Sequence, residues 1–307
     1  MLPTRITNEL LKSGRFTHAR PKIITFDAYN TLYCIKKPVM EQYCIVGSKY
    51  GIKANPEELT QRFPEVFNNI RRKYPLYGKH SDITAEQWWE YLIRDMFRPL
   101  DLPNKMVEEI LLRFEGNGAY TVYSDVRELL ETIKKKYPDV CLGIISNTDP
   151  IVIKLLENLE LKKYFEGNIY LSYDLELKKP DAKLFYHAVS DMLKRNFNQN
   201  QGASLEEVKP FVWHIGDEEK TDLGGALQAG INGVLVDRLN SFGYFDETFS
   251  ELASSKKDLS EDELSLRKVL NHSQPALQAS DAVTDIIKID GRRYVAANFK
   301  SLEALLF

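Results

Sequence analysis

Apolar residues along the chain fall into two kinds of segment. Short apolar runs of strand length occupy residues 22–26, 140–145, 169–171, 211–215 and 233–236. Longer segments have apolar residues three and four positions apart. Those at 150–158 and 182–193 follow short apolar runs, and the one at 125–137 precedes the run at 140–145. Short apolar runs favour strands, whereas spacings of three and four favour helices. The alternation therefore predicts parallel strands joined by right-handed helical crossovers.

Residues 34–119 interrupt this alternation because their pattern is helical throughout. Apolar residues at helical spacing occupy 39–50, 56–73, 84–96 and 105–114. Asn55 before Pro56 is a favourable helix start, and Thr84 three residues before Gln87 predicts a capping box. We therefore expect an α/β fold with a Rossmann-like three-layer parallel sheet core and a helical cap domain inserted after the first strand. The core would comprise residues 22–33 and 120–307, and the cap residues 34–119.

The composition changes after residue 237. Residues 239–285 are polar and charged, which predicts an irregular surface insertion remote from any catalytic pocket. A helix is expected to start there at Ser260, where Glu263 completes a capping box. Asp290-Gly291 predicts the turn of a β-hairpin within 287–295, and residues 301–306 a final helix.

Residues 1–21 form an N-terminal extension with an excess of basic over acidic residues. Placed on a helix, Leu2, Ile6 and Leu10 share one face. An amphipathic, Arg-containing and acid-poor N-terminus is typical of a mitochondrial transit peptide. A solvated helix that leads into the core explains the pattern equally well. We therefore expect an intracellular protein, either cytoplasmic or in the mitochondrial matrix.

Bulk composition limits the classes of function. The 307 residues can bury a large core, and 43% hydrophobic with 28% charged residues is ordinary for a globular protein. A net charge of −3 gives no indication of a nucleic acid or an anionic membrane as partner. No apolar run approaches the length of a bilayer span. Cys34, Cys44 and Cys141 form no C-x-x-C pair and are interpreted as reduced, packed thiols.

Polar residues that suit catalysis follow the predicted strands at several places. Asp27 follows the first run, Ser146 the second, and Asp217 the run at 211–215, with Asp222 five residues later. Lys179 follows a polar loop and precedes the segment 182–193. Ligands gather at the carboxyl ends of strands in an open α/β sheet. A helix cap, a turn or a surface charge explains each residue alone, but Asp27, Ser146, Lys179 and Asp217 together favour a functional site.

Asp27, Ser146, Lys179 and Asp217 resemble, in this order, the four motifs of the haloacid dehalogenase superfamily. The resemblance covers roughly residues 22–237 and the last fifteen. The helical insert with Gln87-Trp88-Trp89 is similar to the haloacid dehalogenase-like hydrolase domain-containing group. The resemblance implies that the insert is a C1 cap, a lid that would exclude water and select the substrate.

The resemblance also implies a nucleophile and a metal. Asp27 would attack a phosphate ester and form an aspartyl-phosphate. Mg²⁺ would be held by Asp27, Asp217 and the backbone carbonyl of Tyr29, with Asp222 as a second-shell or alternative ligand. The strand that ends at Asp27 is then expected to be central, and the carboxylates of Asp27 and Asp217 to lie within about 8 Å of each other.

The other motif residues would bind the substrate or hold the loops. Ser146, Asn147 and Lys179 are the predicted substrate-binding residues, and Lys179 would also neutralise the carboxylates. Asn147 and Thr31 would hold the loops in place. His214 lies within a predicted strand and is interpreted as structural.

Tyr29 departs from the resemblance, because most phosphatases of the superfamily have a second Asp two residues after the nucleophile. That Asp is a general acid and base, and tyrosine, with an ordinary pKa of about 10, is a poor base near neutral pH. Three hypotheses follow: a slow Mg²⁺-dependent phosphomonoesterase, a non-catalytic protein that keeps the fold, or a 2-haloacid dehalogenase. The last is suggested by Asp27-Ala28-Tyr29 and Ser146-Asn147. The acidic run Asp217-Glu218-Glu219 favours a metal site, because clustered carboxylates repel one another unless a cation lies among them.

The substrate is expected to be a small phosphorylated or 2-substituted acid, bound by a monomer or weak homodimer without nucleic acid or membrane. Arg71, Arg72, Lys73 and Trp88 of the cap are candidates to reach the active site. A solvated basic face and a packed indole are the simpler explanations for them.

Overall fold

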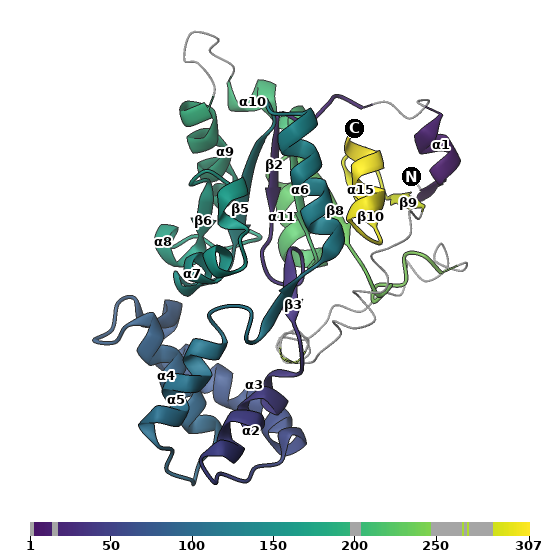
Figure 1. Cartoon of the computed structure of the whole chain (residues 1–307). Coiled ribbons are helices and arrows are strands. Elements are labelled where there is room, and N and C mark those ends of the chain that lie inside the picture. Colours follow the sequence, from purple (N-terminus) through teal and green to yellow (C-terminus); the bar gives the residue numbers. More distant parts are fainter. Residues whose placement is uncertain (1–2, 14–17, 197–203, 247–265, 267–268, 270–284) are drawn as a thin grey trace.

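The computed structural model describes residues 3–13, 18–196, 204–246, 266, 269 and 285–307 (Figure 1). In this part of the chain the core is an eight-stranded sheet with the order β1-β9-β10-β8-β7-β2-β5-β6. Its strands are β1 Thr4–Ile6, β2 Ile23–Phe26, β5 Cys141–Ser146, β6 Ile169–Leu171, β7 Val212–Gly216, β8 Asn232–Val236, β9 Ile286–Lys288 and β10 Arg293–Ala296. The strands from β10 to β6 pair in parallel, as predicted, whereas β1–β9 and β9–β10 pair antiparallel.

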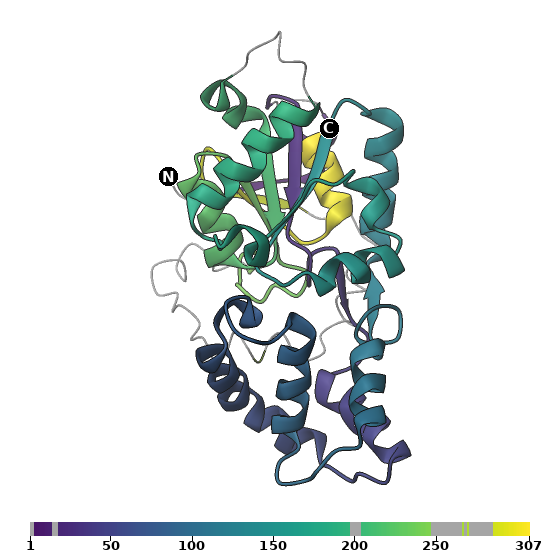
Figure 2. The same ribbon diagram turned by 90° about the vertical axis from the view of Figure 1, so that its left-hand side faces the viewer.

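Helices cover both faces of the sheet (Figures 1 and 2). One face packs against α6 (Ser124–Lys136), α7 (Ile151–Asn158) and α15 (Phe299–Leu306). The other packs against α9 (Ala182–Asn196) and α11 (Gly224–Gln228). Successive strand residues point to opposite faces, so Ile24 and Phe26 join the first cluster and Ile23 joins the second. The short helices α8 (Ser172–Leu175) and α10 (Leu205–Val208) lie in connections. The predicted three-layer α/β core is confirmed.

Strand β2 is central and sets the position of the site. Phe26 lies opposite Ile144 of β5 and Ile215 of β7 in parallel register. The carboxyl ends of the three strands therefore meet at the same edge of the sheet. Asn30 in the following turn has a φ of 59°, a left-handed conformation that Asn adopts more readily than most non-glycine residues.

A helical insertion follows the first core strand, as predicted. It consists of α2 (Val39–Lys49), α3 (Pro56–Lys73), α4 (Ala85–Met96) and α5 (Asn104–Arg113). Asn55 caps α3 by accepting a hydrogen bond from the Glu57 amide at 2.8 Å, and Thr84 with Gln87 forms the predicted capping box. Trp88, Leu92 and other cap residues form a hydrophobic cluster of their own. In Figures 1 and 2 this cap lies against the carboxyl-end edge of the sheet.

The two connections between cap and core form a short ribbon that the sequence pattern did not predict. Strands β3 (Tyr33–Ile35) and β4 (Tyr120–Val122) pair antiparallel, with Cys34 opposite Thr121. The chain therefore enters and leaves the cap through one paired element.

The N-terminal extension differs from the helix that its apolar spacing suggested. Ile6 is buried in strand β1, which pairs with β9, and Leu10 is exposed in α1 (Asn8–Lys12). Leu2 lies outside the described residues. Residues 4–6 thus extend the core sheet, because the β9–β10 hairpin predicted at Asp290-Gly291 supplies an edge for them.

The prediction that the segment 239–285 is remote from the catalytic pocket is wrong for part of that segment. Leu266 and Val269 pack against the hydrophobic cluster of the cap, and Val269 lines the cavity between cap and core. This part of the segment is therefore not remote from the site. Tyr244 is buried against the edge of the sheet and donates a hydrogen bond to Glu219. Ser260 and Glu263, the predicted capping box, lie outside the described residues.

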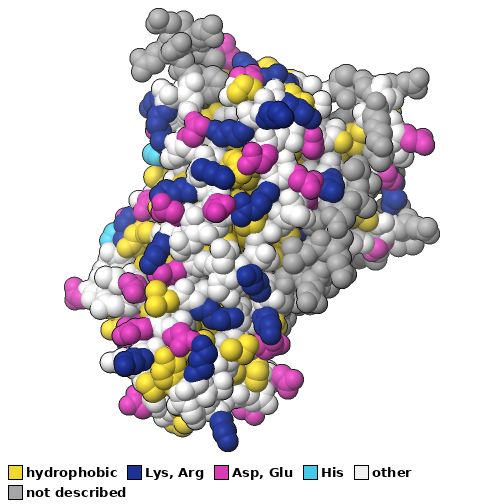
Figure 3. Space-filling view, viewed as in Figure 1, with side chains coloured by type: hydrophobic (Ala, Val, Ile, Leu, Met, Phe, Trp, Pro, Cys, Tyr) yellow, Lys and Arg dark blue, Asp and Glu magenta, His cyan; other side chains and the backbone are white. Residues whose placement is uncertain are grey.

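Lys and Arg side chains alternate with Asp and Glu over the face shown in Figure 3. Within the described residues, none of the helices combines the length and apolar character that crossing a bilayer requires. Burial raises the pKa of the Cys34 and Cys141 thiols to about 11, so both are protonated near neutral pH.

Candidate active site

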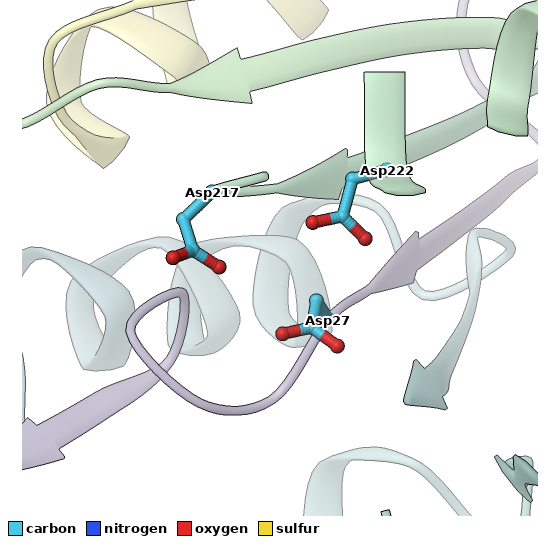
Figure 4. Close-up of side chains that lie close together, drawn as sticks. All are labelled: Asp27, Asp217 and Asp222. Carbon is cyan, nitrogen blue, oxygen red and sulfur yellow. The ribbon is translucent and has the colours of Figure 1, made fainter. Parts of the chain in front are cut away.

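Three carboxylates meet at the carboxyl end of the central strand. Asp27 follows β2, Asp217 follows β7, and Asp222 lies on the π-helical turn Glu219–Leu223. One carboxylate oxygen from each lies within 4.8 Å of the others (Figure 4). Asp27 and Asp217 are thus well inside the 8 Å limit expected from the sequence. Asp27 and Asp217 are 190 positions apart in the sequence. They meet because β2 and β7 are neighbouring parallel strands that end at the same edge of the sheet.

Asp222 reaches the site because its turn packs directly on strand β7. A Cβ atom at Gly216 would lie only 2.1 Å from Cγ of Asp222, so this approach requires glycine. The Glu218 amide donates a hydrogen bond to Oδ2 of Asp222 at 3.0 Å. Single π-helical turns often occur at functional sites.

His214 holds the same carboxylate from within the core. Its Nε2 lies 3.0 Å from Oδ1 of Asp222, and its Nδ1 lies 2.9 Å from the hydroxyl of Thr25. Burial lowers the pKa of His214, so the ring is neutral and donates through Nε2 to the carboxylate. The histidine does not line the cavity. It is a structural residue, but the contact through which it positions Asp222 was not evident from the sequence.

Lys179 is the cation of the site. Its Nζ lies 2.6 Å from Oδ1 of Asp27 and 2.5 Å from Oδ1 of Asp222, and the residue is 3% exposed. Burial alone would lower the pKa of Lys179, but the two carboxylates hold it above its usual range, so the ammonium stays charged. Asn147 fixes the backbone of Lys179: its Oδ1 accepts from the Lys179 amide at 2.8 Å and its Nδ2 donates to the Lys179 carbonyl at 3.0 Å.

The three carboxylates differ in their proton affinity. Burial raises the pKa of Asp27 to about 6, although Lys179 opposes the shift. Burial and the neighbouring acids Glu218 and Asp27 raise the pKa of Asp217 well above its usual value. Burial would also raise the pKa of Asp222, but Lys179 and His214 hold it below its usual range. Thr31 donates a hydrogen bond to Asp217 at 3.2 Å, in keeping with its expected loop-holding role.

This donor set fits a hard divalent cation. Three carboxylates against one ammonium leave an excess of buried negative charge, which a bound cation would offset. Mg²⁺ prefers carboxylate, carbonyl and water oxygens. Lys179 contacts one oxygen of Asp27, which keeps its second oxygen for a metal or a substrate, whereas the second oxygen of Asp222 accepts from the Glu218 amide. The backbone carbonyl of Tyr29 stays a predicted ligand.

Tyr29 contributes an aromatic ring to the wall of the site. Its ring centroid lies 6.0 Å from that of Tyr33 and 6.2 Å from that of Tyr120. Burial raises the pKa of the Tyr29 hydroxyl well above its ordinary value. The phenol is therefore neutral at physiological pH and cannot take a proton from water as an aspartate would.

A cavity of about 290 Å³ lies between these residues and the cap, and Ser146 and Asn147 also line it. Of the candidate cap residues, Arg71, Arg72 and Lys73 are exposed and outside its lining. Trp88 is buried and donates to the Tyr74 carbonyl at 3.0 Å, also outside the lining.

Trp89, next to Trp88 on α4, is among the cap residues that line the cavity, and its Nε1 donates to Asp149 at 3.0 Å. Asp149 was missed from the sequence, although an Asp directly before Pro150 at a helix start is a signal for a capping role. Its Oδ1 accepts from the Ile151 amide at 2.9 Å.

The fold and the acidic site define a class of hydrolase, and the chain belongs to it: residues 21–230 match the haloacid dehalogenase-like hydrolase family. The chain is 48% identical over 287 residues to "Uncharacterized protein YMR130W" of Saccharomyces cerevisiae, covering 94% of this chain and 93% of that protein. It is 24% identical to haloacid dehalogenase-like hydrolase domain-containing protein 3 of Bos taurus, over 70% of this chain and 81% of the relative. The fold is similar to that of L-2-haloacid dehalogenase from Xanthobacter autotrophicus, with a TM-score of 0.55, 16% identity and coverage of 93% and 98% of the two chains.

Proposed function

We propose that the chain is a Mg²⁺-dependent phosphomonoesterase in which Asp27 is the nucleophile. The observation that supports this most is the meeting of three carboxylates within 4.8 Å of one another, two of them bound by Lys179. Asp27, Asp217 and the backbone carbonyl of Tyr29 would hold the metal, with Asp222 behind them or as an alternative ligand. When bound, Mg²⁺ would offset the negative charge of the phosphate and of the carboxylates.

Asp27 would act through the oxygen that Lys179 does not contact. That oxygen attacks phosphorus, and the bond from phosphorus to the ester oxygen breaks, giving an aspartyl-phosphate and an alkoxide that takes a proton from solvent water. Water then attacks the phosphorus of the intermediate, which releases inorganic phosphate and restores the carboxylate. Lys179 keeps Asp27 ionised and contributes positive charge near the phosphate. Ser146 at the end of β5 donates a hydrogen bond to a phosphate oxygen.

The neutral Tyr29 ring explains why hydrolysis would be slow. A carboxylate at this position normally assists both proton transfers, and such assistance contributes roughly 10²–10⁴-fold. Without it, the first step favours esters whose alcohol is a good leaving group, because these need little protonation. The second step would proceed without a general base from residue 29.

A screen of the purified chain tests the proposal. Phosphate monoesters and 2-chloropropionate are incubated with and without Mg²⁺, and phosphate and chloride are measured. We expect phosphate release that requires Mg²⁺ and is lost in Asp27→Asn, whose amide cannot form the aspartyl intermediate. Chloride release without metal would instead support a 2-haloacid dehalogenase. Release of neither ion, with Mg²⁺ bound, would support a non-catalytic protein.

A further inference from the structure

The cap side of the cavity is built from apolar and aromatic side chains. Cap helices and the ribbon between cap and core contribute Phe63, Phe67, Tyr77, Trp89, Phe114 and Tyr120 to its lining. These rings contact one another: Phe63 and Phe67 stack at 5.2 Å, and Phe114 meets Tyr120 edge-on at 5.8 Å. A wall of mutually packed rings is a preformed surface, so an apolar group can enter it without reordering many side chains.

The charges of the lining are distributed unevenly. Among the described residues that line the cavity, Lys179 is the single Lys or Arg, and it lies at the floor with Asp27 and Asp222. Away from the floor the lining has carboxylates, namely Glu86 on α4, Glu115, and the buried Asp149. Glu115 pairs with Lys154 at 2.6 Å, which leaves the ion pair without net charge. Among the described lining residues, a second anionic group on a substrate would meet no cation beyond Lys179 at the floor and would face Glu86 and Asp149.

We infer that the substrate is a phosphate monoester whose organic part is apolar, of about the size of an aromatic ring, and carries no second anionic group. The part of this inference that concerns the phosphate group rests on the proposed function. The part that concerns the organic group rests on the cavity lining. The cavity is close to the lower end of the roughly 300–1,000 Å³ that small-molecule sites occupy, so it admits a small ester. Sugar bisphosphates, nucleoside di- and triphosphates and phosphorylated carboxylic acids carry such a second group, and the charges of the described lining disfavour them.

Two phosphonates that cannot be hydrolysed test this preference by binding alone. Phenylphosphonate and phosphonoacetate share the phosphorus group, but one carries a ring and the other a carboxylate. With Mg²⁺ and the unmodified protein, calorimetry should show phenylphosphonate binding about 10- to 100-fold more tightly, since a buried ring removes apolar area from water. Equal affinities, or tighter binding of phosphonoacetate, would overturn the inference.

Reversing one charge at the cavity gives a matched comparison. Glu86 is exposed in the first turn of α4, so Glu86→Arg should leave the fold intact while adding a cation to the lining. We expect it to tighten phosphonoacetate binding about threefold or more. Glu108→Arg makes the same change at an exposed cap position outside the lining and should not alter either affinity. Equal effects of the two variants would show that the lining charges do not select the substrate.

The binding results separate this inference from the proposed function. Preference for phenylphosphonate without turnover of phenyl phosphate would contradict the phosphatase activity and leave the ligand preference supported. Turnover that favours esters with a second anionic group would support the activity and overturn the preference. Failure of both phosphonates to bind in the presence of Mg²⁺ would overturn both.

Discussion

Nε1 of Trp89 in the cap donates a hydrogen bond to Oδ2 of Asp149 in the core, at 3.0 Å. Asp149 is 3% exposed, and burial raises the pKa of its carboxyl. A buried acceptor that loses a donor becomes costly, so this bond favours the position in which the cap covers the site. Lys79 adds a second contact from the cap, donating to the Tyr173 carbonyl at 2.7 Å.

Replacing Trp89 by Phe should therefore destabilise the protein. The variant keeps an aromatic ring but removes the donor to Asp149, which should lower the free energy of unfolding by about 1–3 kcal/mol. Trp89 and Ile151 donate to different oxygens of Asp149, and Asp149→Asn keeps an acceptor for only one of them, so a comparable loss is expected. Urea unfolding measures both. Equal stabilities of Trp89→Phe and the unmodified protein would contradict a role for this bond.

The fold was predictable largely because its signals are local. The strand–helix alternation gave the parallel core, and Asn55 and Thr84 marked helix starts that the structure confirms. The antiparallel edge was not predictable in the same way. Ile6 forms a strand there because the distant β9–β10 hairpin presents unpaired backbone groups beside it, and a spacing of apolar residues carries no information about such a partner.

Lys179 should be essential for the stability of the metal-free protein. Lys179→Met would leave Asp27 and Asp222 buried without their cation, and loss of one partner of a buried pair costs about 3–5 kcal/mol. Without Lys179, the pKa of both carboxyls should rise. A buried carboxyl with a raised pKa stabilises the folded protein while it is protonated. This contribution is lost as the pH increases through that pKa. The destabilisation measured by urea unfolding in EDTA should thus be larger at pH 8 than at pH 5.

Addition of Mg²⁺ supplies the control for this variant. A cation bound among the carboxylates should restore part of the stability lost in Lys179→Met. If the loss were the same at pH 5 and pH 8 and insensitive to Mg²⁺, it would arise from packing of the lysine stem rather than from its charge.

Mg²⁺ affinity should increase with pH. Burial raises the pKa of Asp27 to about 6 and that of Asp217 well above its usual value, so protons compete with the metal in mildly acid solution. Affinity measured by calorimetry should increase between pH 5 and pH 7. In the metal-free protein, the stability contributed by protonated Asp27 is present below about pH 4 and is lost as the pH rises through 6. Excess Mg²⁺ should reverse that loss, and an affinity independent of pH would contradict the assignment of these carboxylates as ligands.

The candidate site was predictable in its motif residues but not in their support. Asp27, Ser146, Lys179 and Asp217 stand at strand ends or loops, where sequence position indicates proximity. The sequence identifies His214 only as a strand residue. Its hydrogen bond to Asp222 could not be predicted, because it depends on the π-helical turn that positions the carboxylate. Trp88 and Trp89 are adjacent on one helix and point about 100° apart, and which of them faces the cavity is set by how α4 packs.

The last prediction concerns Tyr29, which we expect to limit hydrolysis. Tyr29→Asp returns a carboxylate to the position two residues after the nucleophile. The hydrogen bonds of Lys179 to Asp27 and Asp222, and of Thr31 to Asp217, do not involve the tyrosine ring and should be kept. Turnover of a generic phosphate monoester should rise by about one to three orders of magnitude. Initial rates with saturating Mg²⁺ measure it.

Tyr29→Phe is the matched control because it keeps the ring that packs against Tyr33 and Tyr120 and removes only the hydroxyl. Since burial keeps that hydroxyl protonated, its loss should leave the turnover within about twofold. Asp27→Asn should abolish turnover in both backgrounds. A large loss in Tyr29→Phe, together with no gain in Tyr29→Asp, would mean that the phenol itself takes part in the reaction, because packing is unchanged in the first variant and Mg²⁺ binding can be verified in the second.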